Sequence, residues 1–150
     1  MATRVVVQTR DFELTTEYQR LLDSAPDAGG VVTFIGRVRA GQDRVRALTL
    51  EHYPAMTEPA LGRIARAAED RFAVQSINIV HRVGTLPAGA QIVFVGTAGT
   101  HRNDAFKACR FLIDVLKTQA PFWKKEHTEQ GEHWVAAREI DADAARQWLE

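Results

Sequence analysis

The expected β-strands of this chain arrive in adjacent pairs, and this order constrains the fold more than any other feature. Segments rich in β-branched and aromatic residues cover 30–39 and 47–53, and a second pair covers 76–84 and 91–99. Turn-forming residues separate the two members of each pair, and the first pair is expected to be joined by an arginine-rich loop. Parallel strands need a long crossover between them, so adjacent strands favour an α+β fold with a largely antiparallel sheet.

Four segments are predicted to form helices around these strands. Their expected caps or first residues are Thr16 in a T-x-x-Q capping box, Thr57, Asp104 and Asp141. A first strand at "RVVVQT" precedes the first helix, and a hairpin around "TEQGE" precedes the last one. The predicted order is roughly βαββαββαββα, in a single domain over residues 1–150.

The third of these helices is apolar over most of its circumference and is expected at the centre of the fold. Its polar stripe consists of Lys107, Arg110, Asp114 and Lys117, at spacings of three and four residues. Pro121 disfavours helical geometry in the residue before it, so the helix is expected to end near Gln119. Lys117 therefore lies in its final turn.

The charge balance argues against several classes of partner. Nineteen basic and nineteen acidic residues cancel, so no bulk field would hold the protein on nucleic acid or an anionic membrane. The sequence has no apolar run of transmembrane length and no signal-peptide pattern, which predicts a cytoplasmic protein. A single cysteine, Cys109, excludes an intrachain disulfide, and its apolar neighbours indicate a buried side chain instead of a reactive thiol.

Three lysines crowd an apolar turn in the stretch "LKTQAPFWKKEH". Lys117 and Lys124 flank the proline that ends the central helix, so they approach one spot from different elements, and Lys125 follows directly. The helix dipole favours the charged form of Lys117, whereas neighbouring cations and desolvation by Phe122 and Trp123 favour the neutral amine that a nucleophile needs. The spacing alone is compatible with catalytic lysines and with solvated surface lysines.

Two basic clusters suit a small phosphorylated ligand. The stretch "THRN" at the start of the central helix combines exposed backbone N–H groups with His101 and Arg102. Arg37 and Arg39 lie two residues apart at a strand end and therefore on one face.

Two other polar groups are interpreted as structural. His81 and Arg82 lie inside a strand, where one side chain is expected on each face. Glutamates and histidines crowd residues 126–133, but they lack an HExxH or similar ligand spacing. Neither a metal site nor a cofactor is predicted.

Five segments together resemble the catalytic large subunit of molybdopterin synthase. They are "VVTFIGRVR", "LTLEHYPAMTE", "HRVGTL", "IVFVGTAGTHR" and "LKTQAPFWKKE", and they follow that family's order through most of the chain. The resemblance implies an α/β-hammerhead-like fold and a sulfurtransferase of molybdenum cofactor biosynthesis, which converts cyclic pyranopterin monophosphate to the dithiolene molybdopterin. It also implies a homodimer that forms a heterotetramer with a small ubiquitin-like sulfur-carrier subunit, whose C-terminal Gly-Gly ends in a thiocarboxylate.

The same resemblance assigns roles to individual residues. Lys117 would attack or activate at the partner's tail or the pterin intermediate, and Lys124 would transfer protons and stabilise charge. The pterin-phosphate pocket would be lined by Arg37, Val38, Arg39, His101, Arg102, Lys125 and Glu126, supported by Phe34 and Met56. Arg102 and Lys117 are about 22 Å apart along a helix, which leaves open whether His101 and Arg102 act within one chain or across a dimer.

Two alternative functions remain open on the sequence. A non-catalytic anion-binding scaffold subunit would use the same basic pocket and would tolerate the loss of Lys117. A lysine Schiff-base lyase is supported only by the crowded lysines. Because Cys109 is expected to be buried, a sulfurtransferase built on this chain would need an external sulfur donor.

Overall fold

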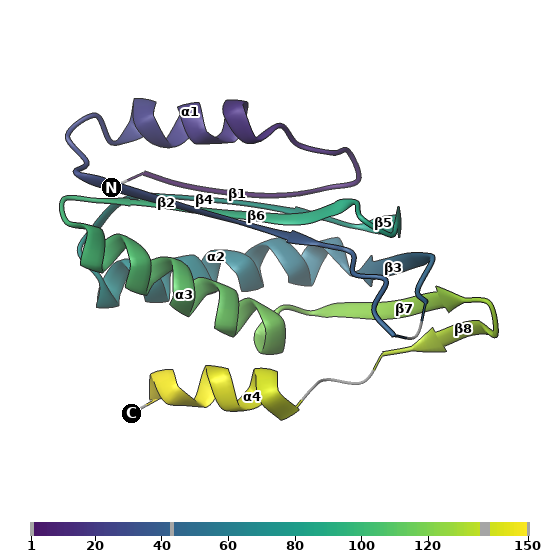
Figure 1. Cartoon of the computed structure of the whole chain (residues 1–150). Helices are drawn as coiled ribbons and strands as arrows, with labels where there is room; N and C mark the ends of the chain where they lie inside the picture. Colours follow the sequence, from purple (N-terminus) through teal and green to yellow (C-terminus); the bar gives the residue numbers. More distant parts are fainter. Residues whose placement is uncertain (1, 43, 136–138, 150) are drawn as a thin grey trace.

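A four-stranded sheet lies between two layers of helices (Figure 1). The computed structural model describes residues 2–42, 44–135 and 139–149. The first sheet has the order β1-β4-β6-β2, formed by β1 (Ala2–Gln8), β4 (Val74–Arg82), β6 (Gln91–Gly99) and β2 (Gly30–Arg37). β1 runs parallel to β4, and the other two pairings are antiparallel.

The helices bury both faces of this sheet. Helix α1 (Leu14–Ser24) covers one face, where Leu21 packs with Phe94 and Val80. Helices α2 (Pro54–Arg71) and α3 (Arg102–Gln119) cover the other face and form the largest core cluster with β4 and β6. The predicted central helix is therefore confirmed, and its end at Gln119 is as predicted.

A second antiparallel sheet lies at one end of the first (Figure 1). Its order is β5-β3-β7-β8, formed by β5 (Gly84–Pro87), β3 (Ala47–His52), β7 (Phe122–Thr128) and β8 (Gly131–Trp134). The predicted hairpin around residue 130 is the β7–β8 pair. The α+β class with largely antiparallel sheets is thus confirmed.

The C-terminal segment folds back onto α3. Helix α4 (Glu139–Arg146) leads into the 3₁₀ helix η1 (Gln147–Leu149). The Trp148 ring packs edge-on against Phe72 and Phe111, and its Nε1 donates a hydrogen bond to Asp114 at 2.9 Å. Among the described residues, no helix has the length and apolar character needed to cross a membrane.

Two predictions about the strands are wrong. β2 and β3 do not pair, because they belong to different sheets. After β2, Val38 turns into the core of the second sheet, and its N–H donates to Ala90 O at 2.8 Å, which carries the chain away from the first sheet. Residues 85–89 were expected to be a turn, yet residues 84–87 form β5, so the observed order is βαββαβββαββα before the final η1.

All four predicted helix starts lie too late in the sequence, and α3 begins at Arg102, two residues before the start predicted near Asp104. α1 begins at Leu14, and the residue before it makes no side-chain cap, so Thr16 lies inside the helix. α2 begins at Pro54, whose fixed φ suits a first helical position. Thr57 is consequently buried inside α2, where its hydroxyl donates to Tyr53 O. α4 begins at Glu139, so Asp141 is not its cap.

Candidate active site

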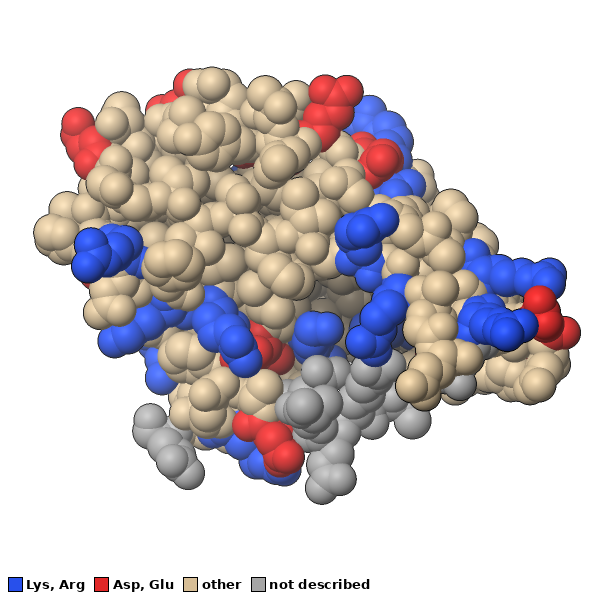
Figure 2. Space-filling model, viewed as in Figure 1, with Lys and Arg blue, Asp and Glu red and all other residues tan. Residues whose placement is uncertain are grey.

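A cavity of about 140 Å³ lies between the two sheets, beside the C-terminal end of α3. Four hydrogen-bonding side chains line it: Arg37 of β2, His81 of β4, Lys117 of α3 and Lys124 of β7. The remaining side chains of the lining are apolar, namely Phe34, Leu50, Ile92, Val93, Val95, Ile113, Leu116, Ala120 and Phe122. On the face shown in Figure 2, Lys and Arg side chains gather around a hollow near the end of α3.

The two lysines reach this cavity from different elements. Lys117 lies in the last turn of α3 and is exposed. The helix ends at Gln119, and Pro121 directs the chain into β7, where half-buried Lys124 lies opposite Leu50 in the register. The proline-broken turn thus brings both lysines to one cavity, as their spacing predicts.

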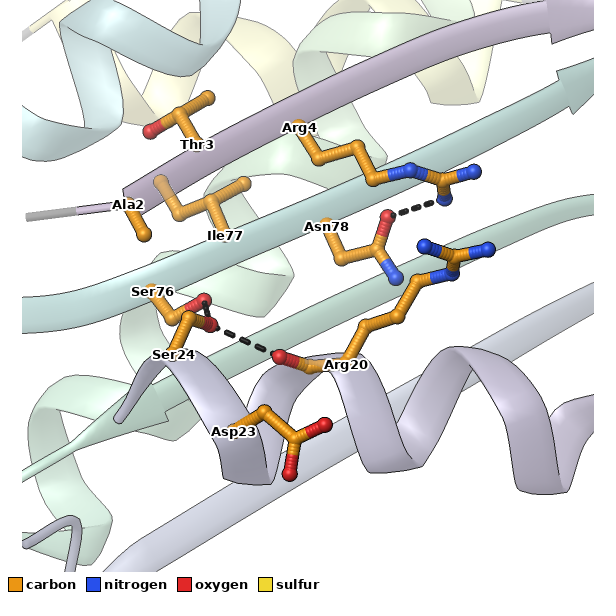
Figure 3. Close-up of a pocket in the computed structure, with 9 residues that line it drawn as sticks. All are labelled: Ala2, Thr3, Arg4, Arg20, Asp23, Ser24, Ser76, Ile77 and Asn78. Carbon is orange, nitrogen blue, oxygen red and sulfur yellow. Dashed lines mark hydrogen bonds between the residues drawn. The ribbon is translucent and has the colours of Figure 1, made fainter. Parts of the chain in front are cut away.

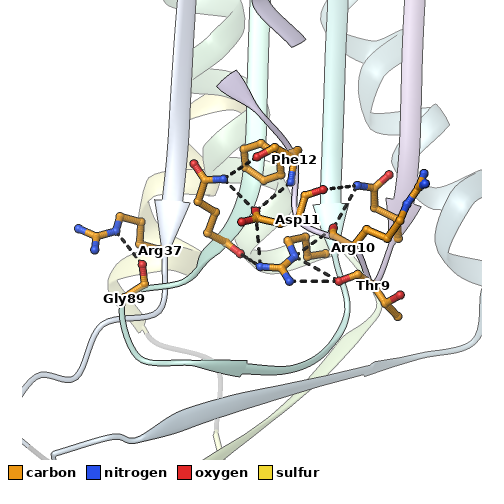
Figure 4. A network of polar contacts seen from close by, with 9 residues as sticks. Thr9, Arg10, Asp11, Phe12, Arg37 and Gly89 are labelled. Atoms are coloured by element: carbon orange, nitrogen blue, oxygen red, sulfur yellow. Dashed lines mark hydrogen bonds and ion pairs between the residues drawn. The ribbon is translucent and has the colours of Figure 1, made fainter. Parts of the chain in front are cut away.

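Arg37 is held at the same cavity by the loop before β6. Its Nε donates a hydrogen bond to the carbonyl of Gly89 at 3.1 Å (Figure 4). Gly89 has a φ of 88°, a left-handed conformation that favours glycine. The loop backbone therefore fixes the direction of the guanidinium.

The other candidate residues lie elsewhere in the single chain. Val38 is buried in the core of the second sheet, and Arg39 is exposed beyond the end of β2. Lys125 lies on the opposite face of β7 from Lys124, with its Nζ 4.7 Å from the centre of the Trp134 ring. Glu126 lines a separate surface cavity beside β8.

His101 and Arg102 lie at the N-terminal end of α3, and the cavity lies at its C-terminal end. Of the two supporting residues, Phe34 lines the cavity and Met56 is exposed on α2. The binding roles of all these residues remain predictions.

His81 is a cavity residue that sequence reasoning interpreted as structural. Its ring stacks on Phe122, with centroids 4.0 Å apart and planes 18° from parallel. Nδ1 lies 2.9 Å from the carbonyl of Arg82, which can only accept, so Nδ1 carries the proton. Burial above all, together with the nearby charges of Lys124 and His52, lowers the pKa of His81 to about 4, although the Arg82 carbonyl opposes the shift.

Arg82 points to the other side of β4, as the strand pattern predicts. Its guanidinium donates to the carbonyls of Thr9, Arg10 and Gln91, at distances of 2.9–3.3 Å. It also lies 3.6 Å from Asp11, and the same network is seen in Figure 4. A hydrogen bond from Gln91 is the main cause that lowers the pKa of Asp11. Arg82 therefore fixes the β1–α1 loop, which is a structural role.

The buried neutral imidazole of His81 predicts a loss of stability in acid. An unfolded chain binds a proton at His81 near pH 6.5, whereas the native chain does so only near pH 4. The contribution is fully present above pH 6.5 and is lost as the pH falls through 4, amounting to about 3 kcal/mol. Urea unfolding measured from pH 7 to pH 4 should show this fall. It should be much smaller in His81→Gln and unchanged in the exposed-histidine control His133→Gln.

A larger cavity lies beside α1, away from the candidate residues (Figure 3). Arg4, Arg20, Ser24 and Asn78 are among the residues that line its volume of about 390 Å³. Buried Glu17 accepts hydrogen bonds from Arg4 and Asn78 and pairs with Arg20 at 3.6 Å. This network joins α1 to β1 and β4, so these polar groups have a structural explanation.

Comparison with known proteins identifies the family. The model of the MoaE protein family matches residues 7–119. The chain is 47% identical to the molybdopterin synthase catalytic subunit of Vibrio cholerae over 150 residues, covering 99% of each chain.

The chain belongs to the MoaE family.

Other members of the MoaE family extend the similarity. The Escherichia coli K12 molybdopterin synthase catalytic subunit is 48% identical over 148 residues, covering 97% of this chain and 98% of that protein. A MoaE structure from Burkholderia ambifaria superposes with a TM-score of 0.85 at 48% identity, covering 100% of this chain and 99% of the other. For a molybdopterin synthase structure from Staphylococcus aureus, the TM-score is 0.77 at 28% identity, covering 89% and 96%.

The single cysteine of this MoaE family member lies in the core, as predicted. Cys109 is 2% exposed on α3, and its thiol contacts the carbonyl of Val95. Burial raises the pKa of the thiol to about 12. At neutral pH this group is therefore a protonated and almost fully buried thiol, whereas a sulfur carrier needs a reactive, accessible one.

Proposed function

We propose that this chain is the catalytic subunit of a molybdopterin synthase. It transfers two sulfur atoms to cyclic pyranopterin monophosphate and so forms the dithiolene molybdopterin, in the cytoplasm. The sulfur comes from the thiocarboxylate on the C-terminal Gly-Gly of a small partner subunit. The observation that carries this proposal is the meeting of Lys117, Lys124 and Arg37 in one cavity, in a chain that is 47% identical to a protein named for this function.

The size of the cavity suits a peptide tail better than a whole pterin. Pockets that enclose drug-sized molecules measure roughly 300–1,000 Å³, whereas this cavity holds about 140 Å³. A segment that ends in two glycines is thin enough to enter, and the three cationic side chains attract its negative terminus. The larger pterin would then react at the mouth of the cavity.

The positions of the two lysines support different roles. Lys117 is exposed at the end of α3, so it can meet both the tail and the pterin, and its amine attacks or activates the reacting group. Lys124 is half-buried on β7 and supplies proton transfer and charge stabilisation. Neither role needs a metal or a cofactor.

The direct test supplies the purified chain with cyclic pyranopterin monophosphate and the thiocarboxylated partner. The expected result is formation of the dithiolene, which mass spectrometry would detect. Binding of both ligands without any dithiolene would support the alternative of a non-catalytic anion-binding scaffold.

The pterin-phosphate site is proposed to span two copies of the chain. His101 and Arg102 lie at one end of the 18-residue helix α3, and Lys117 lies at the other. Their backbones are about 22 Å apart at 1.5 Å per residue. A two-fold axis would bring the N-terminal end of α3 in one copy toward the lysines of the other copy. Two copies and two partner subunits would then form a heterotetramer.

Subunit mixing tests whether the site is shared. One chain carries Lys117→Ala and the other carries His101→Ala with Arg102→Ala, so each homodimer is inactive. If the site is shared, every mixed dimer regains one complete site. About a quarter of the wild-type rate is expected when half the dimers are mixed, as random pairing gives. Dimers shown to be mixed by mass spectrometry but without activity would place the whole site within one chain.

A further inference from the structure

His81 is the one side chain in the described lining of the cavity that can accept a hydrogen bond. Arginine and the charged form of lysine are donors only, and the rest of the lining is apolar or glycine. This composition suits a negative group, which accepts from Arg37, Lys117 and Lys124. His81 is then the side chain that can accept a hydrogen bond from an N–H donor that enters with that group.

The ring of His81 is fixed so that its acceptor atom faces away from its own backbone. Nδ1 donates to the Arg82 carbonyl at 2.9 Å, and Phe122 stacks on the ring face. The lone pair is therefore on Nε2, at the far edge of the imidazole. His81 is 7% exposed and lines the cavity, so this edge, the one not bonded to Arg82, is the part of the ring edge that a ligand there could contact.

Burial above all, and then charges on several elements, keep this ring neutral. Lys124 on β7 and His52 on β3 both oppose its protonation, and Lys117 on α3 and Arg37 on β2 share the cavity. With a pKa of about 4, the imidazole is uncharged at neutral pH and is a weak base. It suits the acceptance of a hydrogen bond better than the removal of a proton.

We propose that Nε2 of His81 accepts a hydrogen bond from a backbone N–H of the glycine-ended tail that enters the cavity. This inference rests on the function proposed above, in which the tail binds here. Apart from His81, the described lining offers a buried peptide N–H no side-chain acceptor to replace its bonds to water, and an unreplaced bond weakens binding. His81 replaces the lost bond, so the cavity recognises a peptide bond as well as a negative terminus.

The decisive experiment removes the donor atom from the ligand. A semisynthetic partner subunit carries an ester in place of the amide at the last or the penultimate peptide bond, with an ordinary terminal carboxylate so that no reaction occurs. Calorimetry gives Kd for each partner against wild-type protein and His81→Phe, which keeps the stacked ring but has no acceptor. At one of the two positions, the ester should weaken binding to the wild type by about tenfold. In His81→Phe, the same ester should change Kd by less than about twofold.

Controls separate this contact from a structural role of His81. A structural role alone would make His81→Phe weaken the amide and ester partners by the same factor, and that result at both positions would overturn the proposal. If His81→Phe does not fold, as judged by circular dichroism, His81→Leu takes its place in the same cycle. Because the cycle uses carboxylate partners, it is independent of turnover. Failure of the proposed function would instead be seen as no dithiolene from wild-type protein and thiocarboxylated partner.

Discussion

Replacement of Lys117 by alanine is expected to reduce dithiolene formation by about 10³-fold or more, because it removes the amine assigned to attack or activation. The fold should survive, since Lys117 is an exposed residue in the last turn of α3. Its interaction with the helix dipole contributes under about 1 kcal/mol to the free energy of unfolding. Single-turnover kinetics and thermal unfolding on the same sample measure the two effects separately.

Two matched variants sharpen this experiment. Lys117→Arg should not restore activity, because arginine stays protonated and cannot act as a nucleophile. Lys107→Ala removes another exposed lysine from α3, outside the cavity lining, and should keep the wild-type rate. Turnover close to wild type in Lys117→Ala would exclude a catalytic role for this lysine and would favour the scaffold alternative.

Deletion of the terminal Gly-Gly of the partner is expected to abolish sulfur transfer. The cavity is narrow and basic, so the tail is the part of the partner that can reach Lys117 and Lys124. The complex should weaken only partly, because the globular body of the partner would dock on a separate surface. Product formation with the truncated partner tests the loss of sulfur transfer, and the Kd of its complex with this chain tests the partial loss of affinity.

The control is the full-length partner with a carboxylate in place of the thiocarboxylate. It should bind with the full affinity and yield no product, which separates the loss of sulfur from the loss of the tail. A truncated partner that received a thiocarboxylate on its new end and still supported wild-type turnover would contradict entry of the tail through this cavity.

Local signals in the sequence predicted the central elements of the fold well. Helix α3 was predicted correctly because the spacing of its apolar residues and the proline after it are signals that neighbouring residues carry by themselves. The pairing of β2 with β3 was wrong because adjacency in sequence does not reveal that Val38 leaves one sheet for the core of the other. Strand β5 was missed because its four residues include a glycine and a proline, and its pairing with β3 is a tertiary contact.

The residues of the candidate site show the same difference between local signals and tertiary contacts. Lys117 and Lys124 could be placed together because a proline between them turns the chain. His81 could not, since its partner Phe122 is distant in sequence and nothing local shows which face of β4 is buried against the cavity. A strand histidine inside an apolar run was the available signal, and it also fits ordinary core packing.

The connection between β4 and β6 has a kinetic consequence for the cavity. This connection contains β5, which pairs with β3 in the second sheet. The chain also passes into the second sheet after β2, where β3 follows, and after α3, where β7 follows. The walls of the cavity that come from the two sheets are therefore joined by the backbone at several places. We therefore expect the cavity to keep its width instead of opening like a hinge. The proposed peptide tail would enter it end-first, and its residence time would be set by the rate at which it slides out.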